Sequence, residues 1–297
     1  MVAVLAIVPI VLLVMLGYLI GRRRWLSDEA ATGLAKLTFT LFMPVLLFTG
    51  IAKAALAEGL SPHLLLGYFL PVLLVFTLVN LLVHLRRGKA SPLGLSAAYS
   101  NNVLIGIPLV ATLLGTDSLI YLFAILVFHS LLLFSLHSLY AAFGSGEKLQ
   151  PLALLKTLGN PIIIGLLLGA ALNVSGLALP APLWTLAGWL SAAAMPCALM
   201  VLGMSLARYS LRVTPAVLGL TLVKLAVFPL AVYLLGTWLG LNDTARAVLV
   251  LMAACPTGVN VLAFVRTAQE SATVSSTVCL STLLATVSLP LWMALLG

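Results

Sequence analysis

The chain has 297 residues, of which 63% are hydrophobic and only 7% charged, and its mean hydropathy is +1.23. A soluble domain carries roughly 25% charged residues because its surface faces water, so this composition excludes a soluble protein. The formal charge of +8 is an excess of the kind that nucleic-acid-binding proteins show. Its distribution along the chain is instead that of a membrane-topology pattern.

Ten hydrophobic segments follow one another with short connections. A membrane-spanning helix needs about 20 consecutive apolar residues, so the sequence predicts an all-α polytopic membrane protein with ten spans. They run over residues 2–20, 36–55, 63–85, 93–115, 118–143, 156–174, 183–206, 213–238, 244–265 and 272–296. The first segment has no preceding basic region and no obvious cleavage site, which indicates a retained span rather than a signal peptide.

Basic residues concentrate in the connections after every second span. The opposite side holds Lys53 and Arg246, and Lys224 falls inside a span. The other 12 of the 15 basic residues are Arg22, Arg23, Arg24, Lys36, Arg86, Arg87, Lys89, Lys148, Lys156, Arg208, Arg212 and Arg266. By the positive-inside rule this set faces the cytoplasm, which puts both termini on the non-cytoplasmic side of the cell (inner) membrane. Nucleic-acid binding is not expected.

Prolines and glycines recur at a constant spacing between the two halves of the chain. Four pairs lie 152 residues apart, namely Pro9 and Pro161, Gly17 and Gly169, Pro44 and Pro196, and Gly67 and Gly219. The offset then drifts to 148 for Pro108 and Pro256. Each half, residues 1–147 and 148–297, holds five spans. Because five is odd, the second half enters the membrane from the opposite side, and the repeat is predicted to be inverted.

Two spans contain a proline and a glycine two residues apart. The fourth span has Gly106 and Pro108, and the ninth has Pro256 and Gly258. Proline lacks an N–H group and clashes with the preceding turn, and glycine tolerates unusual dihedral angles, so both helices are predicted to break there. A simple kink is the alternative for either span alone. Matched positions in both halves favour two crossed broken helices, whose freed N–H groups near the midplane suit an anion.

Asparagines flank both predicted breaks. Asn101 and Asn102 precede the first, and Asn260 follows the second. Because unpaired amides are costly in hydrocarbon, these three either join helices by hydrogen bonds or contact a substrate, and Asn101 is the strongest candidate for contact. Asn160, just before Pro161, has the position of a helix N-cap.

Lys224 lies deep within the eighth span. A lysine that reaches the interface is the alternative, but we expect a role at the crossing, where the ammonium would replace a bound sodium ion or pair with a substrate carboxylate. All seven acidic residues fall in connections or at span ends, which argues against a carboxylate proton relay. His129 and His137 could titrate, although helix packing is the favoured role. The three cysteines show no metal-ligand spacing, and no metal or cofactor is expected.

Together these segments resemble the auxin efflux carrier family, which includes the plant PIN-FORMED carriers and bacterial proteins known as malonate or malate permeases. The resemblance rests on residues 101–108, the break at 254–258, Met43-Pro44, Met195-Pro196, Asn160-Pro161 and the stretch 275–290. The chain lacks the long cytoplasmic loop that plant members carry after span five. It therefore looks like a compact prokaryotic member.

The resemblance implies a fold similar to bile-acid and sodium/proton transporters. Spans one, two, six and seven would form a scaffold, and the other six a transport domain that moves as an elevator. By motif position Asn101, the backbone at Val103 and a residue near Asn160 would touch a carboxylate, with Met43 contacting the ligand from the scaffold. Thr257 stands where plant carriers have Gln, which argues against auxin-like acids. The full set of expected substrate-binding residues is Met43, Asn101, Asn102, Val103, Gly106, Pro108, Asn160, Pro256, Thr257, Gly258 and Asn260.

The sequence thus predicts a secondary transporter that binds small organic anions at the crossing of the two broken helices, either mono- or dicarboxylates such as malonate, malate or auxin-like acids. A membrane receptor or a channel-like pore on the same fold is the alternative, but a sensor has no evident need for a symmetric midplane site. An enzyme is not expected, because no intramembrane carboxylate pair or Ser–His arrangement appears. The expected partners are the organic anion and the lipid bilayer, and the Gly- and Ala-rich scaffold faces also permit a homodimer.

Overall fold

The computed structural model describes residues 2–53, 61–145 and 159–296, which are helical apart from connections and one isolated bridge between two extended segments. Six helices within these ranges are long and apolar enough to cross a membrane, namely Asp28–Ala52, Pro62–Arg86, Thr116–Phe143, Ala181–Leu206, Pro215–Trp238 and Ala268–Leu296. Two shorter apolar helices are Asn102–Leu114 and Pro161–Ser175. The predicted all-α polytopic class is therefore confirmed. The predicted junction of the halves at 147/148, and Lys148 and Lys156, lie outside the described residues.

The α-helices are α1 (Val2–Arg23), α2 (Asp28–Leu37), α3 (Met43–Ala52), α5 (Pro62–Arg87), α6 (Leu93–Ala98), α7 (Ile107–Leu114), α8 (Leu119–Ser145), α10 (Pro161–Ser175), α11 (Ala181–Leu206), α12 (Pro215–Leu222), α13 (Phe228–Trp238), α14 (Asp243–Ala254) and α15 (Ala268–Leu296). The π-helical turns are η1 (Thr38–Phe42), η2 (Asn102–Gly106) and η4 (Val223–Val227), and the 3-10 turns are η3 (Thr116–Ser118) and η5 (Val259–Phe264). The second helix starts well before the predicted residue 36. Ser27 accepts the N–H of Ala30 at 3.2 Å, and this N-cap begins α2 at Asp28.

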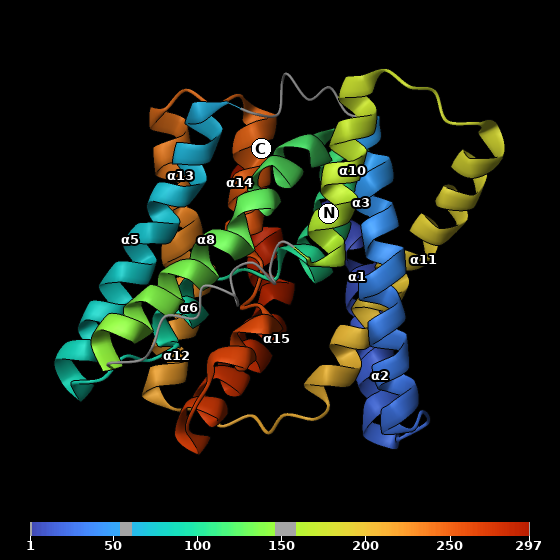
Figure 1. Ribbon diagram of the computed structural model, residues 1–297. Coiled ribbons are helices and arrows are strands. Elements are labelled where there is room, and N and C mark those ends of the chain that lie inside the picture. Colours follow the sequence, from blue (N-terminus) through green and yellow to red (C-terminus); the bar gives the residue numbers. More distant parts are fainter. Residues whose placement is uncertain (1, 54–60, 146–158, 297) are drawn as a thin grey trace.

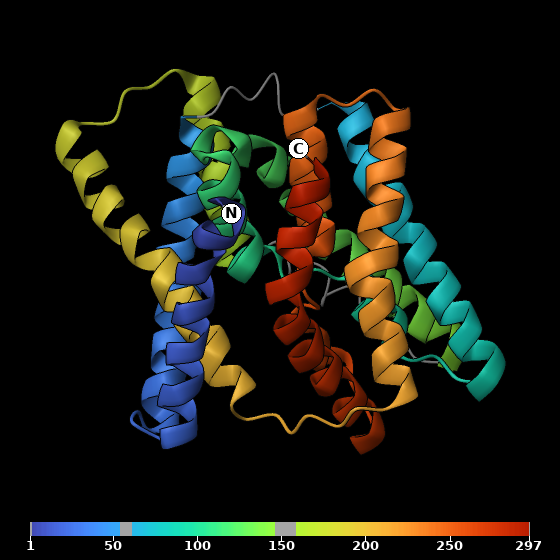
Figure 2. The same cartoon turned by 180° about the vertical axis from the view of Figure 1, so that it is seen from behind.

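The helices form two groups that stand beside each other (Figures 1 and 2). In one group α1, α2, α3, α10 and α11 pack on one another, and in the other α5, α6, α8 and α12 to α15 do so. Helix α7 contacts α1 from the first group and both α8 and α14 from the second. The connection between α6 and α7 therefore lies where the two groups meet.

Two glycines that the repeat relates make equivalent contacts in the first group. Gly17 on α1 packs against the backbone of Met200 on α11, and Gly169 on α10 packs against the backbone of Phe48 on α3. A Cβ atom at either glycine would collide with that backbone. Phe48 and Met200 are themselves 152 residues apart, the spacing that separates the two glycines. The same close helix contact therefore occurs twice, once in each pair.

Three prolines inside helices are accommodated by π-helical turns. Pro44, Pro108 and Pro229 each follow such a turn, at the second position of the next helix. A proline ring clashes with the carbonyl four residues earlier, and the wider turn moves that carbonyl aside. For Pro229 this carbonyl belongs to Leu225, and the indole N–H of Trp292 donates to it at 2.8 Å. These helices therefore continue through their prolines.

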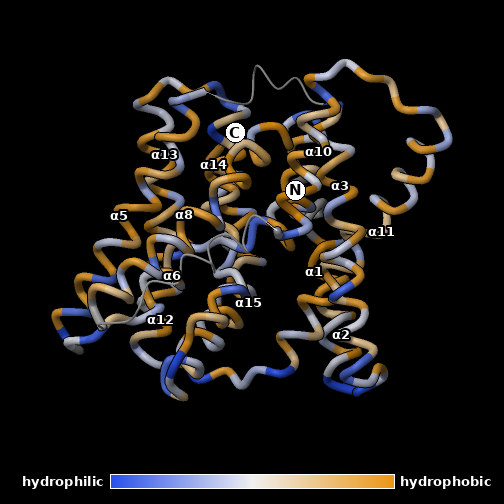
Figure 3. The backbone as a smooth tube through the Cα atoms, viewed as in Figure 1, coloured by the Kyte–Doolittle hydropathy of each residue, from blue (hydrophilic) through white to orange (hydrophobic). Residues whose placement is uncertain are grey.

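The basic connections lie at one end of the helices. The turn between α1 and α2, the end of α5, the connection between α11 and α12 and the start of α15 are all at the lower end in Figure 1. Figure 3 shows hydrophilic segments at this end and apolar residues along the helices. Arg208 joins two of these connections by an ion pair to Asp28 at 2.9 Å. The four connections thus share one end of the molecule.

Candidate functional site

Two interrupted helices cross in the interior. The first interruption separates α6, which ends at Ala98, from η2, which begins at Asn102, and the second separates α14 from η5. The extended segments between them form an antiparallel bridge at Ser100 and Thr257. The N–H of Asn101 donates to the Pro256 carbonyl at 2.9 Å, and the N–H of Gly258 donates to the Tyr99 carbonyl at 3.0 Å. The two breaks are therefore joined by their own backbones.

The first break lies earlier than the sequence predicts. Gly106 has helical dihedral angles, φ −61° and ψ −45°, and Pro108 sits within a continuous helix from Asn102 to Leu114. The π-helical turn η2 absorbs the clash of the proline ring, so the helix has no need to break there. The interruption falls instead at Tyr99–Asn101, where Tyr99 is extended with ψ 111°. Gly106 and Pro108 thus shape the half-helix that leaves the crossing.

The second break lies at Pro256, as predicted. Cys255 is extended at φ −55° and ψ 144°, because a residue before proline is pushed out of the helical region. Thr257 is fully buried, and both of its polar groups are used within the protein. Its N–H donates to Ser281 Oγ at 3.1 Å and its hydroxyl to the Ser96 carbonyl at 2.9 Å. Thr257 therefore fastens the crossing to neighbouring helices.

Lys224 reaches the crossing from η4. Its side chain is fully buried, and Nζ donates to Ser100 Oγ at 2.8 Å and to the Ala253 carbonyl. Nζ also lies 4.8 Å from the ring centroid of Phe228. The ion pairs found among the described residues do not include Lys224, so its charge faces carbonyl and hydroxyl oxygens. Those oxygens include the C-terminal end of α14, where the helix dipole favours a cation.

The start of η2 presents hydrogen-bond donors. Asn101 is 95% buried, and its Nδ2 has no hydrogen-bond partner within the described part of the chain. The first N–H groups of a helix have no acceptor within that helix. In this helix the first intrahelical hydrogen bonds are those from the N–H groups of Ile105 and Gly106 to the Asn101 carbonyl. Val103 precedes them. Asn102 turns the other way, and its Nδ2 donates to the Tyr68 hydroxyl at 3.1 Å. A carboxylate is the kind of ligand that such a group of donors binds.

Asn260 lies just beyond the second break, and its side chain is exposed. Its Nδ2 donates to the Tyr99 hydroxyl at 3.3 Å. The two scaffold residues implied by the resemblance lie in the first group of helices. Met43 is fully buried at the start of α3, and Asn160 caps α10 by accepting the N–H of Ile162 at 3.0 Å. The N-cap expected at Asn160 is present.

The sequence patterns do not predict several residues that take part in the crossing. Ser100 binds Lys224 and Ser281 binds Thr257, but a lone serine in an apolar segment carries little information. The run Ser100-Asn101-Asn102 is the one local signal, since three consecutive polar residues are unusual in a span. Within the described ranges, no group of three or more His, Cys, Asp and Glu side chains could hold a metal ion.

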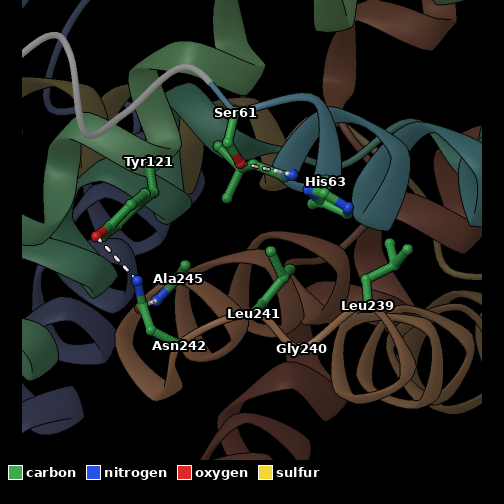
Figure 4. Close-up of a pocket in the computed structure, with 9 residues that line it drawn as sticks. Ser61, His63, Tyr121, Leu239, Gly240, Leu241, Asn242 and Ala245 are labelled. Atoms are coloured by element: carbon green, nitrogen blue, oxygen red, sulfur yellow. Dashed lines mark hydrogen bonds between the residues drawn. The ribbon is translucent and has the colours of Figure 1, made fainter.

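A separate pocket of about 240 Å³ lies away from the crossing (Figure 4). It is formed by the start of α5, the turn between α13 and α14, and Tyr121 on α8. Asn242 caps α14 there, and its Nδ2 donates to the Tyr121 hydroxyl at 3.3 Å. None of the crossing residues lines this pocket.

Comparisons with known proteins agree with this architecture. The chain matches the family model described as "Membrane transport protein" over residues 2–150 and 147–293. A protein of Methanothermobacter thermautotrophicus described as an "Uncharacterized transporter" is 29% identical over 98% of this chain and 97% of its own length. A protein of Rhizobium meliloti described as a "Putative malonate transporter" is 28% identical over 86% of this chain and 83% of its own length.

Crossed helix breaks in an apolar helical protein, together with these matches, define a multi-pass membrane transporter. The chain belongs to the membrane transport protein family, which is the auxin efflux carrier family that its motifs resemble.

Proposed function

We propose that the protein is a secondary transporter that binds small organic anions, mono- or dicarboxylates, at the crossing of the two broken helices. The observation that carries this proposal is the buried, unpartnered Nδ2 of Asn101 at the start of η2, where the N–H of Val103 precedes the first hydrogen bonds within the helix. Buried donors without partners are costly, and an anionic ligand satisfies them. Lys224, whose Nζ donates to the Oγ of the neighbouring Ser100, adds a positive charge.

The exposure of Asn260 supports a wet opening at the crossing. It lies three residues beyond Thr257 of the bridge, between the buried helix α14 and the helix Ala268–Leu296, which is long enough to cross a membrane. A polar amide exposed at such a depth is tolerated where it lines a cavity that contains water or ligand. The proposed opening would lie where the two helix groups meet, close to the second break.

The two groups suit an elevator mechanism with ten spans in two inverted halves. The first group would be the scaffold, and the second, with α7, the transport domain that carries the crossing. The repeated contact of Gly17 with Met200 and of Gly169 with Phe48 supports the internal symmetry. These tight contacts would keep the scaffold rigid while the other group moves.

The common end of the basic connections would face the cytoplasm of the cell (inner) membrane, with both termini outside. A homodimer would use those faces of the scaffold helices that the glycine contacts within one chain leave uncovered. Malonate is a reasonable first substrate to test, because one relative is named for it. Lys224 would compensate the charge of the bound anion and would stand where other carriers hold a coupling cation.

Uptake into proteoliposomes tests the proposal. The purified full chain is reconstituted and offered a panel of mono- and dicarboxylates under imposed sodium, proton and voltage gradients. We expect saturable uptake that is accelerated by the same anion on the far side, which a channel or a receptor does not show. Asn101→Ala should raise KM, whereas Asn173→Ala, on α10 outside the crossing, should not. If no anion moves under any gradient, the proposed function is wrong.

A further inference from the structure

Tyr99 holds the amide of Asn260 in one orientation. The Tyr99 hydroxyl accepts from Asn260 Nδ2 at 3.3 Å and lies 2.8 Å from Ser130 Oγ on α8. The hydrogen bond between the two hydroxyl groups can run in either direction, because each oxygen can donate or accept. Because Asn260 Nδ2 donates to the Tyr99 hydroxyl, the amide oxygen of Asn260 faces away from Tyr99.

The ring of Tyr99 is fixed on both faces. It stacks on His129 with ring centroids 4.8 Å apart and on Phe134 at 4.9 Å. A Cβ atom at residue 258 would lie 2.5 Å from the ring, and glycine leaves that space open. The Tyr99 carbonyl also accepts the N–H of Gly258. The hydroxyl therefore has little freedom to move, and the first break sets the position of its hydrogen bond to Asn260.

The crossing thus offers donors from one break and an acceptor from the other. Asn101 Nδ2 and the N–H of Val103 suit a carboxylate, whereas the Asn260 oxygen suits a hydrogen-bond donor. We propose, resting on the proposed function, that this site selects carboxylates that bear a donor near the carboxylate. A dicarboxylate would then be carried as its monoanion, with the second carboxyl protonated and donating to Asn260.

This proposal assigns the transported proton to the substrate. A dianion would bring a second carboxylate oxygen against the amide oxygen of Asn260. Both atoms are hydrogen-bond acceptors, so no hydrogen bond can form between them. The described acidic side chains lie at helix ends or connections, so none offers a relay at the crossing. Titratable side chains do surround the crossing, namely Lys224, His129, Tyr68, Tyr99 and Cys255. A test must therefore separate titration of the substrate from titration of the protein.

Malonamate, the monoamide of malonate, provides that separation. It carries one negative charge and a donor that does not titrate, whereas monomethyl malonate carries the same charge and no donor. We would measure uptake of these two and of malonate by the reconstituted full chain, at pH values below and above the second ionisation of malonate. Malonamate uptake should be equal at both, and malonate uptake should fall roughly tenfold per pH unit above that ionisation.

The ester should move about threefold to tenfold more slowly than malonamate, because one hydrogen bond is lost. Malonate uptake with the pH dependence of malonamate, or ester uptake as fast as that of malonamate, would overturn the inference and leave the proposed function standing. Absence of uptake for every anion would overturn the proposed function instead. The two failures are thus distinct.

Tyr99→Phe tests the positioning role. It keeps the ring stack and frees the Asn260 amide to turn, so the ratio of malonamate to ester uptake should fall towards one. Asn260→Ala, at an exposed position, should give the same loss of discrimination without disturbing the rings. Tyr140→Phe is the matched control, since its hydroxyl donates to the Asn80 carbonyl at 3.4 Å and not to Asn260. An unchanged ratio in Tyr99→Phe and Asn260→Ala would refute the role of this pair.

Discussion

Replacing Lys224 with Met tests whether the buried ammonium takes part in transport. Met has a similar length, so the change leaves no large cavity at this fully buried position. It removes the hydrogen bonds to Ser100 Oγ and to the Ala253 carbonyl. An orphaned buried acceptor costs about 1–3 kcal/mol, and removal of a buried charge without a carboxylate partner offsets part of that cost. The variant should therefore fold, with its Tm lowered by only a few degrees.

Transport should suffer much more than folding. A hydrogen bond or contact that involves a charged group contributes about 1.5–3 kcal/mol, so its loss should raise KM about 10-fold to 150-fold. The assay is concentration-dependent uptake into proteoliposomes across a range of pH. Lys53→Met is the control, because Lys53 is exposed and lies 4.5 Å above the ring of Trp184, away from the crossing. An unchanged transport rate and pH dependence in Lys224→Met would refute the reasoning.

Three further substitutions test the packing around the site. Gly17→Ala should lower the free energy of unfolding by about 1–3 kcal/mol, because the added Cβ atom collides with the backbone of Met200. Gly33→Ala is the control, because the space around Gly33 is open and its free energy of unfolding should not fall. Thermal melting in detergent measures both variants. Gly258→Ala should abolish uptake while the protein is still made, because its methyl group displaces the Tyr99 ring; retained uptake would contradict this. Trp292→Phe should cost about 1–3 kcal/mol by orphaning a carbonyl in η4, and an unchanged Tm would show that another group replaces the indole.

The two breaks show how far local sequence predicts this fold. At Pro256 the cause is local, since proline forces Cys255 out of the helix, and the break falls where the sequence indicates. At Pro108 the same local rule gives the wrong position, because η2 relieves the clash without a break. The choice between a wider turn and an interruption depends on neighbours. Here the bridge to Thr257 stabilises the extended backbone at Ser100.

The contacts of Lys224 and Asn260 show what the local sequence does not predict. The sequence indicates that Lys224 is deep in the membrane, because charged residues within apolar spans are rare. It does not identify Ser100, 124 residues away, as the acceptor. Likewise the Asn260–Tyr99 hydrogen bond joins residues 161 apart. Such pairs form through the packing of helices that are distant along the chain, and no local periodicity records them.

Charge balance connects Lys224 with the protonation state of the substrate. Lys224 brings one positive charge to the described crossing, so a bound monoanion makes the site neutral and a bound dianion leaves it negative. Moving an uncompensated charge through a low-dielectric region costs several kcal/mol, which favours movement of the neutral, monoanion-loaded site. The empty site then returns with its positive charge. Membrane potential should therefore change net uptake of malonamate but not its exchange between loaded sites, and a voltage-dependent exchange would contradict this charge assignment.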